Sequence, residues 1–133
     1  MSAATSTPGK RVLLVDDNPD AVESLALLLD MFGFDVRTAT TGTAGLTMGR
    51  DFRPDVVLLD IAMPTIDGYE TCRQMRATEW GAPIRIIAMT GWSQDSDRQR
   101  SREAGFSAHL VKPVEPDALM ALLEPRQDGG ACT

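Results

Sequence analysis

The sequence contains no apolar run long enough to cross a bilayer, since runs such as Val56–Leu59 are far shorter than a membrane span. It also lacks a secretory leader, because the first nine residues, MSAATSTPG, are small and polar, without a basic start or an apolar block. We therefore expect a flexible leader at 1–9, no membrane association and a cytoplasmic location.

Cysteine is scarce, and the 13 basic residues are outnumbered by 19 acidic ones. Cys72 and Cys132 follow no ligand or disulfide spacing, which suits a reducing compartment. A net charge of −6 argues against a nucleic-acid-binding surface, which needs clustered basic residues. Arg98, Arg100 and Arg102 do gather, but between acidic neighbours they are most simply a solvated helix face.

The 133 residues, 43% of them hydrophobic and 24% charged, suffice for one globular domain. Continuous apolar runs bounded by turn residues are typical of strands buried on both faces of a parallel sheet. A further segment alternates apolar and polar residues and should lie at a sheet edge. The expected strands are Val12–Val15, Phe34–Thr38 (the edge strand), Val56–Leu59, Ile84–Met89 and Ala108–Val111.

Helix signals separate these strands. Asn18 is a good N-cap before an apolar face that Gly33 ends, and Pro116 suits a first helical turn. The helix predicted at 43–50 contains Gly45 and Gly49, which disfavour a helix. Its prediction therefore rests mainly on the need for a crossover between parallel strands. The other helices are predicted at about 19–32, 68–79, 96–104 and 115–123.

The element order is therefore βα repeated five times. It predicts an α/β fold, a doubly wound (βα)5 parallel sheet with helices on both faces. Ligands of such sheets bind outside the carboxyl ends of the strands. We expect one domain over 10–124 and a flexible tail over 125–133.

Chemically active side chains follow the strands at that edge. Asp16 and Asp17 follow the first run, Asp60 the third, Thr90 the fourth and Lys112 the last. Three carboxylates repel one another unless a cation offsets their charge, and all-oxygen ligands favour Mg²⁺ or Mn²⁺. Thr90 and Lys112 are groups that suit phosphate oxygens. The pattern predicts metal-assisted phosphoryl transfer.

This constellation resembles the receiver domain of two-component response regulators, including the chemotaxis regulator, from about residue 10 to 123. The motifs that carry the likeness are Val15–Asn18, Leu59–Gly68, Met89–Gly91 and Val111–Pro113. The resemblance implies the flavodoxin-like strand order 2-1-3-4-5. The stretch from Thr90 to Pro116 is also similar to receivers of hybrid histidine kinases, although the short tail and the Met1 start suggest a free-standing regulator.

The resemblance also implies roles. Asp60 would accept a phosphoryl group from a histidine kinase or a histidine phosphotransfer protein. Asp17, Asp60 and the Ala62 carbonyl would bind Mg²⁺ directly, and Asp16 would bind it through water. Thr90 and Lys112 would hold phosphoryl oxygens while the surface of the last two helices and the strand between them, near 92–123, signals to an unknown protein. His109 stands where the family has an aromatic switch residue, and whether it acts as one stays open.

Other functions fit less well. An aspartate-based phosphatase of the haloacid dehalogenase type needs a second Asp two residues after the nucleophile, and here that residue is Ala62. Nucleotide hydrolysis is disfavoured by the lack of a G-x-x-x-x-G-K-[ST] motif. The remaining alternative is a receiver-fold module that binds partners without phosphorylation. We therefore expect a signalling phosphoacceptor that is not an enzyme beyond promoting its own phosphorylation and dephosphorylation.

Overall fold

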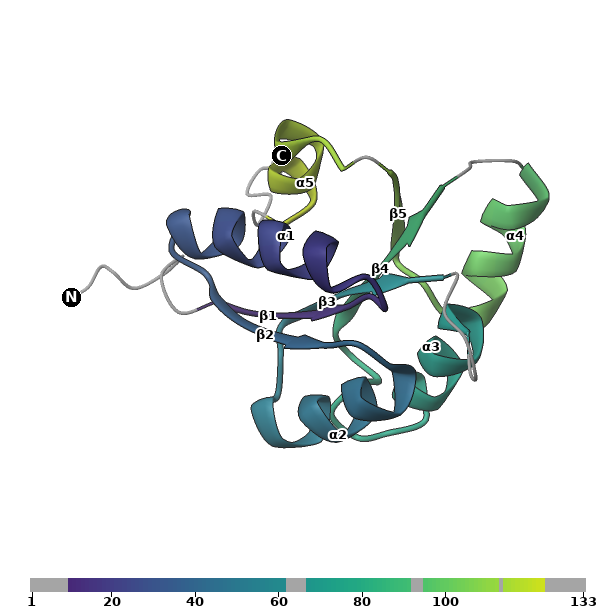
Figure 1. The fold of residues 1–133 in the computed structure, drawn as a ribbon. Helices are drawn as coiled ribbons and strands as arrows, with labels where there is room; N and C mark the ends of the chain where they lie inside the picture. The colour runs from purple at the N-terminus through teal and green to yellow at the C-terminus, as the bar shows by residue number, and fades with distance from the viewer. Residues whose placement is uncertain (1–9, 62–66, 92–94, 113, 124–133) are drawn as a thin grey trace, which may run out of the picture.

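The computed structural model describes residues 10–61, 67–91, 95–112 and 114–123. Strands and helices alternate along them in the predicted βα order (Figure 1). In chain order they are β1 (Arg11–Val15), α1 (Pro19–Met31), β2 (Asp35–Ala39), α2 (Gly42–Phe52), β3 (Val56–Asp60), α3 (Gly68–Arg76), β4 (Arg85–Thr90), α4 (Asp95–Ala104), β5 (Ala108–Val111) and α5 (Pro116–Leu123). The leader and tail predicted at 1–9 and 125–133 lie outside the described residues.

The five strands form one sheet in the order β2-β1-β3-β4-β5, which confirms the predicted topology. Every pairing is parallel, and the register aligns Val15 with Leu59, Leu59 with Ala88 and Ala88 with His109. β2 lies at an edge, as expected. The carboxyl ends of β1, β3 and β4 therefore lie side by side.

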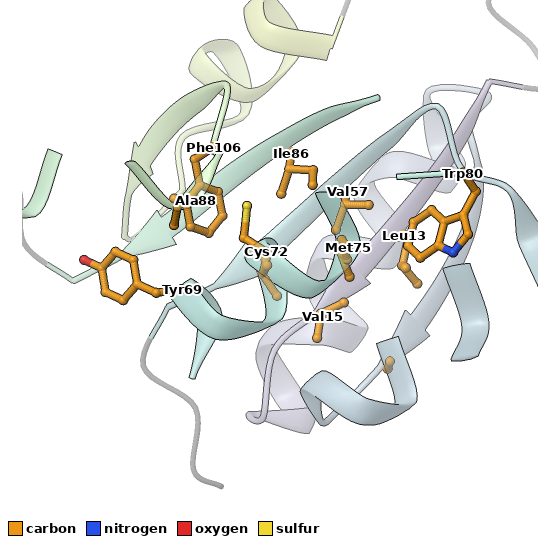
Figure 2. Packing of buried hydrophobic residues seen from close by; sticks show 13 residues of the cluster. Leu13, Val15, Val57, Tyr69, Cys72, Met75, Trp80, Ile86, Ala88 and Phe106 are labelled. Carbon is orange, nitrogen blue, oxygen red and sulfur yellow. The ribbon is translucent and has the colours of Figure 1, made fainter. Parts of the chain in front are cut away.

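Helices cover both faces of the sheet (Figure 1), with α1 and α5 on one face and α2, α3 and α4 on the other. Alternate residues of each strand face opposite layers, so the domain has two cores. Figure 2 shows the core on the side of α2, α3 and α4, in which Cys72 and Met75 of α3 pack with strand residues such as Val57 and Ile86. Two packed cores hold the strand ends, and hence the predicted site, in place.

Helix α3 ends at Arg76 and not at the predicted Glu79. The Thr78 hydroxyl donates to the Met75 carbonyl at 2.6 Å and accepts from Gly81 N at 2.9 Å, which turns the chain there. The turn brings Trp80 against α2, where a Cβ on Gly49 would lie 2.2 Å from the indole ring. Tertiary packing of Trp80 thus overrides the local helix signal.

Helix α2 is longer than the predicted 43–50. Thr41 caps it, its hydroxyl accepting from Ala44 N at 3.0 Å, and Arg53 ends it in the left-handed conformation with φ 57°. Both internal glycines are sites of close approach, Gly45 to Val15 and Gly49 to the indole just described. They explain why this helix packs closely despite a composition that disfavours helix.

Candidate functional site

The rim formed by the carboxyl ends of the strands gathers the polar residues that the sequence singled out. β3 and β4 each extend one residue beyond the predicted end, so Asp60 and Thr90 are the last residues of these strands. Asp16 and Lys112 directly follow β1 and β5, as predicted. Asp16, Asp60 and Thr90 are buried, with exposed fractions of 3%, 4% and 5%. Buried polar groups at one edge of a sheet are typical of a binding site.

The backbone on either side of Asp60 is tightly fixed. Ile61 N donates to the Met89 carbonyl at 3.1 Å, and Gly68 N donates to the Ile61 carbonyl at 2.8 Å. A Cβ on Gly68 would lie 2.5 Å from the Asp60 carbonyl oxygen and 2.5 Å from Ile61 Cα. Only glycine therefore permits the first turn of α3 to approach the backbone of Asp60 so closely.

Lys112 connects the two buried carboxylates. Its Nζ donates to Asp16 Oδ2 at 2.8 Å and lies 3.4 Å from Asp60 Oδ1. Burial lowers the pKa of Lys112, but the hydrogen bond to Asp16 and the negative charges of Asp60 and Asp16 outweigh it, so the pKa is raised from its ordinary value of 10.5. The ammonium group therefore stays charged and offsets part of the acidic charge.

Asp17 completes a group of three carboxylates. One oxygen each of Asp16, Asp17 and Asp60 lies within 4.8 Å of the others, and Asp17 is exposed. Asp16 is further oriented by Asn18, whose backbone N donates to Asp16 Oδ1 at 3.0 Å. This donor set fits a hard divalent cation, since magnesium prefers carboxylate oxygens and keeps some water ligands. The fourth predicted ligand, the carbonyl of Ala62, lies outside the described residues.

The two predicted switch residues lie on the same face of the sheet. Strand alternation places Thr90 on the side of Ala88, and Ala88 is paired with His109 across β4 and β5. Lys112 N donates to the Thr90 carbonyl at 2.7 Å, which ties the end of β4 to the residue after β5. Both residues thus face the layer that contains α3 and α4.

Charge patterning predicts only a solvated helix face for Arg100. The Arg100 side chain is 60% exposed, but its guanidinium carbon lies 4.1 Å from the centre of the Tyr69 ring and its Nη2 4.0 Å from Asp67 Oδ2. Tyr69 in turn packs edge-on against Phe106 (Figure 2), with ring centres 6.3 Å apart. Arg100 thus links α4 to the start of α3, a contact that charge patterning could not reveal because it joins two helices distant in the sequence.

A family model described as the response regulator receiver domain matches residues 12–124. Among curated proteins, Protein PilH of Pseudomonas aeruginosa is 34% identical over 110 residues, which cover 83% of this chain and 91% of PilH. The DNA-binding response regulator MtrA of Mycobacterium tuberculosis is 36% identical over 120 residues, which cover 90% of this chain and 51% of MtrA. The chain spans about half the length of MtrA and of the Synechocystis regulator RpaA.

Solved structures agree. Vibrio cholerae chemotaxis protein CheY4 superposes with a TM-score of 0.84 at 28% identity, covering 86% of this chain and 96% of CheY4. The receiver domain of the Pseudomonas aeruginosa sensor histidine kinase PA1611, described with a magnesium ion coordinated in its active site cleft, gives a TM-score of 0.79 at 32% identity and covers 86% of this chain and 93% of that domain. The chain therefore belongs to the response regulator receiver domain family of two-component signalling proteins.

Proposed function

We propose that the chain is a phosphoacceptor that receives a phosphoryl group on Asp60 from a phosphohistidine. The observation that carries this proposal is the buried Asp60 carboxylate, 3.4 Å from Lys112 Nζ and within 4.8 Å of two further carboxylates. An oxygen of Asp60 attacks phosphorus, the phosphorus–nitrogen bond to the histidine breaks, and an acyl phosphate forms. Receiver domains are signalling proteins and not enzymes in the usual sense, so we propose no turnover of an external substrate.

The proposed cofactor is Mg²⁺, with Mn²⁺ as a substitute. Asp17 and Asp60 would bind it directly and Asp16 through water, and Mg²⁺ would supply positive charge next to the phosphoryl oxygens. The magnesium reported in the PA1611 receiver supports this assignment at 32% identity.

The chain's own residues position and neutralise the phosphoryl group. Lys112 contributes a charge that its raised pKa maintains at neutral pH. The hydroxyl of Thr90, at the end of the neighbouring strand, donates to a phosphoryl oxygen. Because both residues also hold the backbone at the ends of β4 and β5, the added charge biases the α4-β5-α5 surface, which signals to a downstream protein. His109 on that surface is the proposed second switch residue.

The proposed partners are a histidine kinase or a histidine phosphotransfer protein and a downstream protein. We propose that this domain does not contact nucleic acid, because its net charge of −6 opposes phosphate binding. The relatives MtrA and RpaA are named as DNA-binding, but the chain covers only about half of each. No described helix is long and apolar enough to cross a membrane, and we propose a cytoplasmic location.

The test is the intact mass after incubation with a small phosphodonor and Mg²⁺. Acetyl phosphate tests the acceptor, and phosphoimidazole tests transfer from an imidazole nitrogen. We expect one phosphoryl adduct that is absent in Asp60→Asn and after metal chelation, and an initial rate roughly tenfold or more lower in Lys112→Ala.

The matched control is Asp51→Asn, which removes an exposed carboxylate of α2 far from the rim. It should label like the unmodified protein. If no variant and no condition produced an adduct, the domain would instead be a binding module that works without phosphorylation.

A further inference from the structure

A pocket lies between α4 and β5, away from the carboxylate rim. It has a volume of about 310 Å³ and is lined by Ser101, Arg102, Phe106, Ser107, Ala108 and His109. Pockets that bind small molecules start at about this size and combine an apolar wall with a few converging polar groups. Here Phe106 supplies the aromatic side chain of the lining.

Two serine hydroxyl groups in this pocket can donate a hydrogen bond to a ligand. Ser101 is 1% exposed, and its Oγ has no hydrogen-bond partner among the residues that the structure describes. A serine inside a helix can donate to the carbonyl one turn earlier, but within the described residues Ser101 does not. Ser107 Oγ accepts from Ile86 N at 3.2 Å and from Arg76 Nη2 at 3.1 Å. With both lone pairs used, the Ser107 hydroxyl can serve a ligand only as a donor.

The charge of the pocket is positive. Arg102 contributes a guanidinium group, which donates hydrogen bonds and accepts none. No acidic side chain lines the pocket within the part of the chain that the structure describes. The nearest acid on α4, Glu103, accepts from Gln99 at 3.3 Å. The lining thus favours a ligand that is negatively charged and rich in acceptors.

The carbonyl groups at the C-terminus of α4, beside the pocket, repel an anion less than unbonded carbonyl groups would. α4 ends at Ala104, and the last carbonyls of a helix normally carry partial negative charge. The Ser101 carbonyl, however, accepts from Gly105 N at 3.2 Å and from Phe106 N at 3.0 Å, and the Arg102 carbonyl accepts from Gly105 N at 3.0 Å. These carbonyls are therefore occupied by backbone donors.

We infer that this α4–β5 pocket binds the oxyanion of a small organic acid, a carboxylate or phosphate ester carried on a flat apolar body. The oxyanion accepts from the Ser101 and Ser107 hydroxyls and pairs with Arg102, and the apolar body contacts Phe106. This site is separate from the carboxylate rim, and its occupation requires neither metal nor phosphorylation.

The experiment is a titration of the whole ¹⁵N-labelled chain, without phosphodonor and with a metal chelator, followed by NMR. The probes are benzoate, phenyl phosphate and the neutral benzamide. We expect saturable shifts confined to amides of residues 101–109 for benzoate or phenyl phosphate, and weaker or absent shifts for benzamide. Whichever of benzoate and phenyl phosphate binds more tightly identifies the class of ligand as a carboxylate or a phosphate ester.

Variants assign the binding to named groups. Ser101→Ala removes a hydroxyl that has no hydrogen-bond partner in the described part of the chain. The variant should therefore fold normally and bind benzoate or phenyl phosphate roughly tenfold more weakly. Arg102→Gln should weaken them at least as much. Arg50→Gln, an equal loss of charge on the exposed surface of α2, should leave binding unchanged.

Three results would overturn the inference: no saturable shift with either acid, equal affinity for benzamide, or unchanged affinity in Ser101→Ala. The amide spectrum of each variant reports its fold, so a loss of binding caused by unfolding is recognised directly.

Discussion

Replacing Gly68 with alanine tests whether the start of α3 holds the backbone of the proposed phosphoacceptor. The new Cβ would lie 2.5 Å from both the Asp60 carbonyl oxygen and Ile61 Cα, and neither atom can move without shifting the end of β3. Overpacking of this kind costs about 1–3 kcal/mol, and alanine's better helix propensity returns at most about 1 kcal/mol at a helix terminus.

We therefore expect Gly68→Ala to lower the free energy of unfolding by roughly 2 kcal/mol, measured by chemical denaturation. For a domain of this size that corresponds to a drop of about 8 °C in Tm. Because Asp60 moves with its backbone, the initial rate of labelling by acetyl phosphate should fall as well.

The matched control is Gly91→Ala. Among the described residues, a Cβ on Gly91 would meet nothing within 4 Å, and the φ of Gly91 lies outside the left-handed range, so the stability of Gly91→Ala should be unchanged or slightly raised. If Gly68→Ala were as stable as Gly91→Ala, the close approach of α3 to Asp60 would not be a constraint, and the reasoning would fail.

Three further predictions follow from the same structure. Mg²⁺ at a hundredfold excess over its Kd should stabilise the fold by about 2.7 kcal/mol, and Asp17→Asn should remove most of this gain; an undiminished gain would place the metal elsewhere. Burial raises the pKa of Cys72 to about 11, so in a Cys132→Ser background the thiol should resist a disulfide reagent at pH 8 until denaturant is added, and rapid reaction of the native protein would contradict its burial. Arg76→Lys keeps the charge but not the forked donors that bond the Gly81, Ala82, Ile84 and Gly105 carbonyls, so Tm should fall by roughly 10 °C, and an unchanged Tm would show that these loops hold without it.

The strand order and most element bounds could be predicted because the strands are buried on both faces. Runs such as Val56–Leu59 are fully buried, so their composition reports the environment directly. Helix ends depend on contacts between distant residues. α3 ends early because Trp80 packs on α2, and no local signal near Glu79 encodes that contact.

The charged members of the site could be predicted for a different reason. Asp16, Asp60 and Lys112 follow or end buried strands, and parallel topology brings such positions to one rim whatever the helices do. The contact of Arg100 with Tyr69 and the unpartnered hydroxyl of Ser101 could not be predicted, because both depend on how α4 is rotated against its neighbours. Helix periodicity alone leaves that rotation undetermined where the apolar face is weak.

We expect the folding stability of this rim and the labelling of Asp60 to depend on different residues. Lys112 forms salt bridges to both Asp16 and Asp60, and its side chain remains 32% exposed. Removing Lys112 leaves two buried acids that repel each other. Bound Mg²⁺ can offset their charge, so with Mg²⁺ present Lys112→Ala should impair labelling more than folding. A Cβ on Gly68 would first meet the backbone of Asp60 and Ile61, so its substitution should impair both. A variant set that separates the two effects in this way would show that the rim is held by packing and activated by charge.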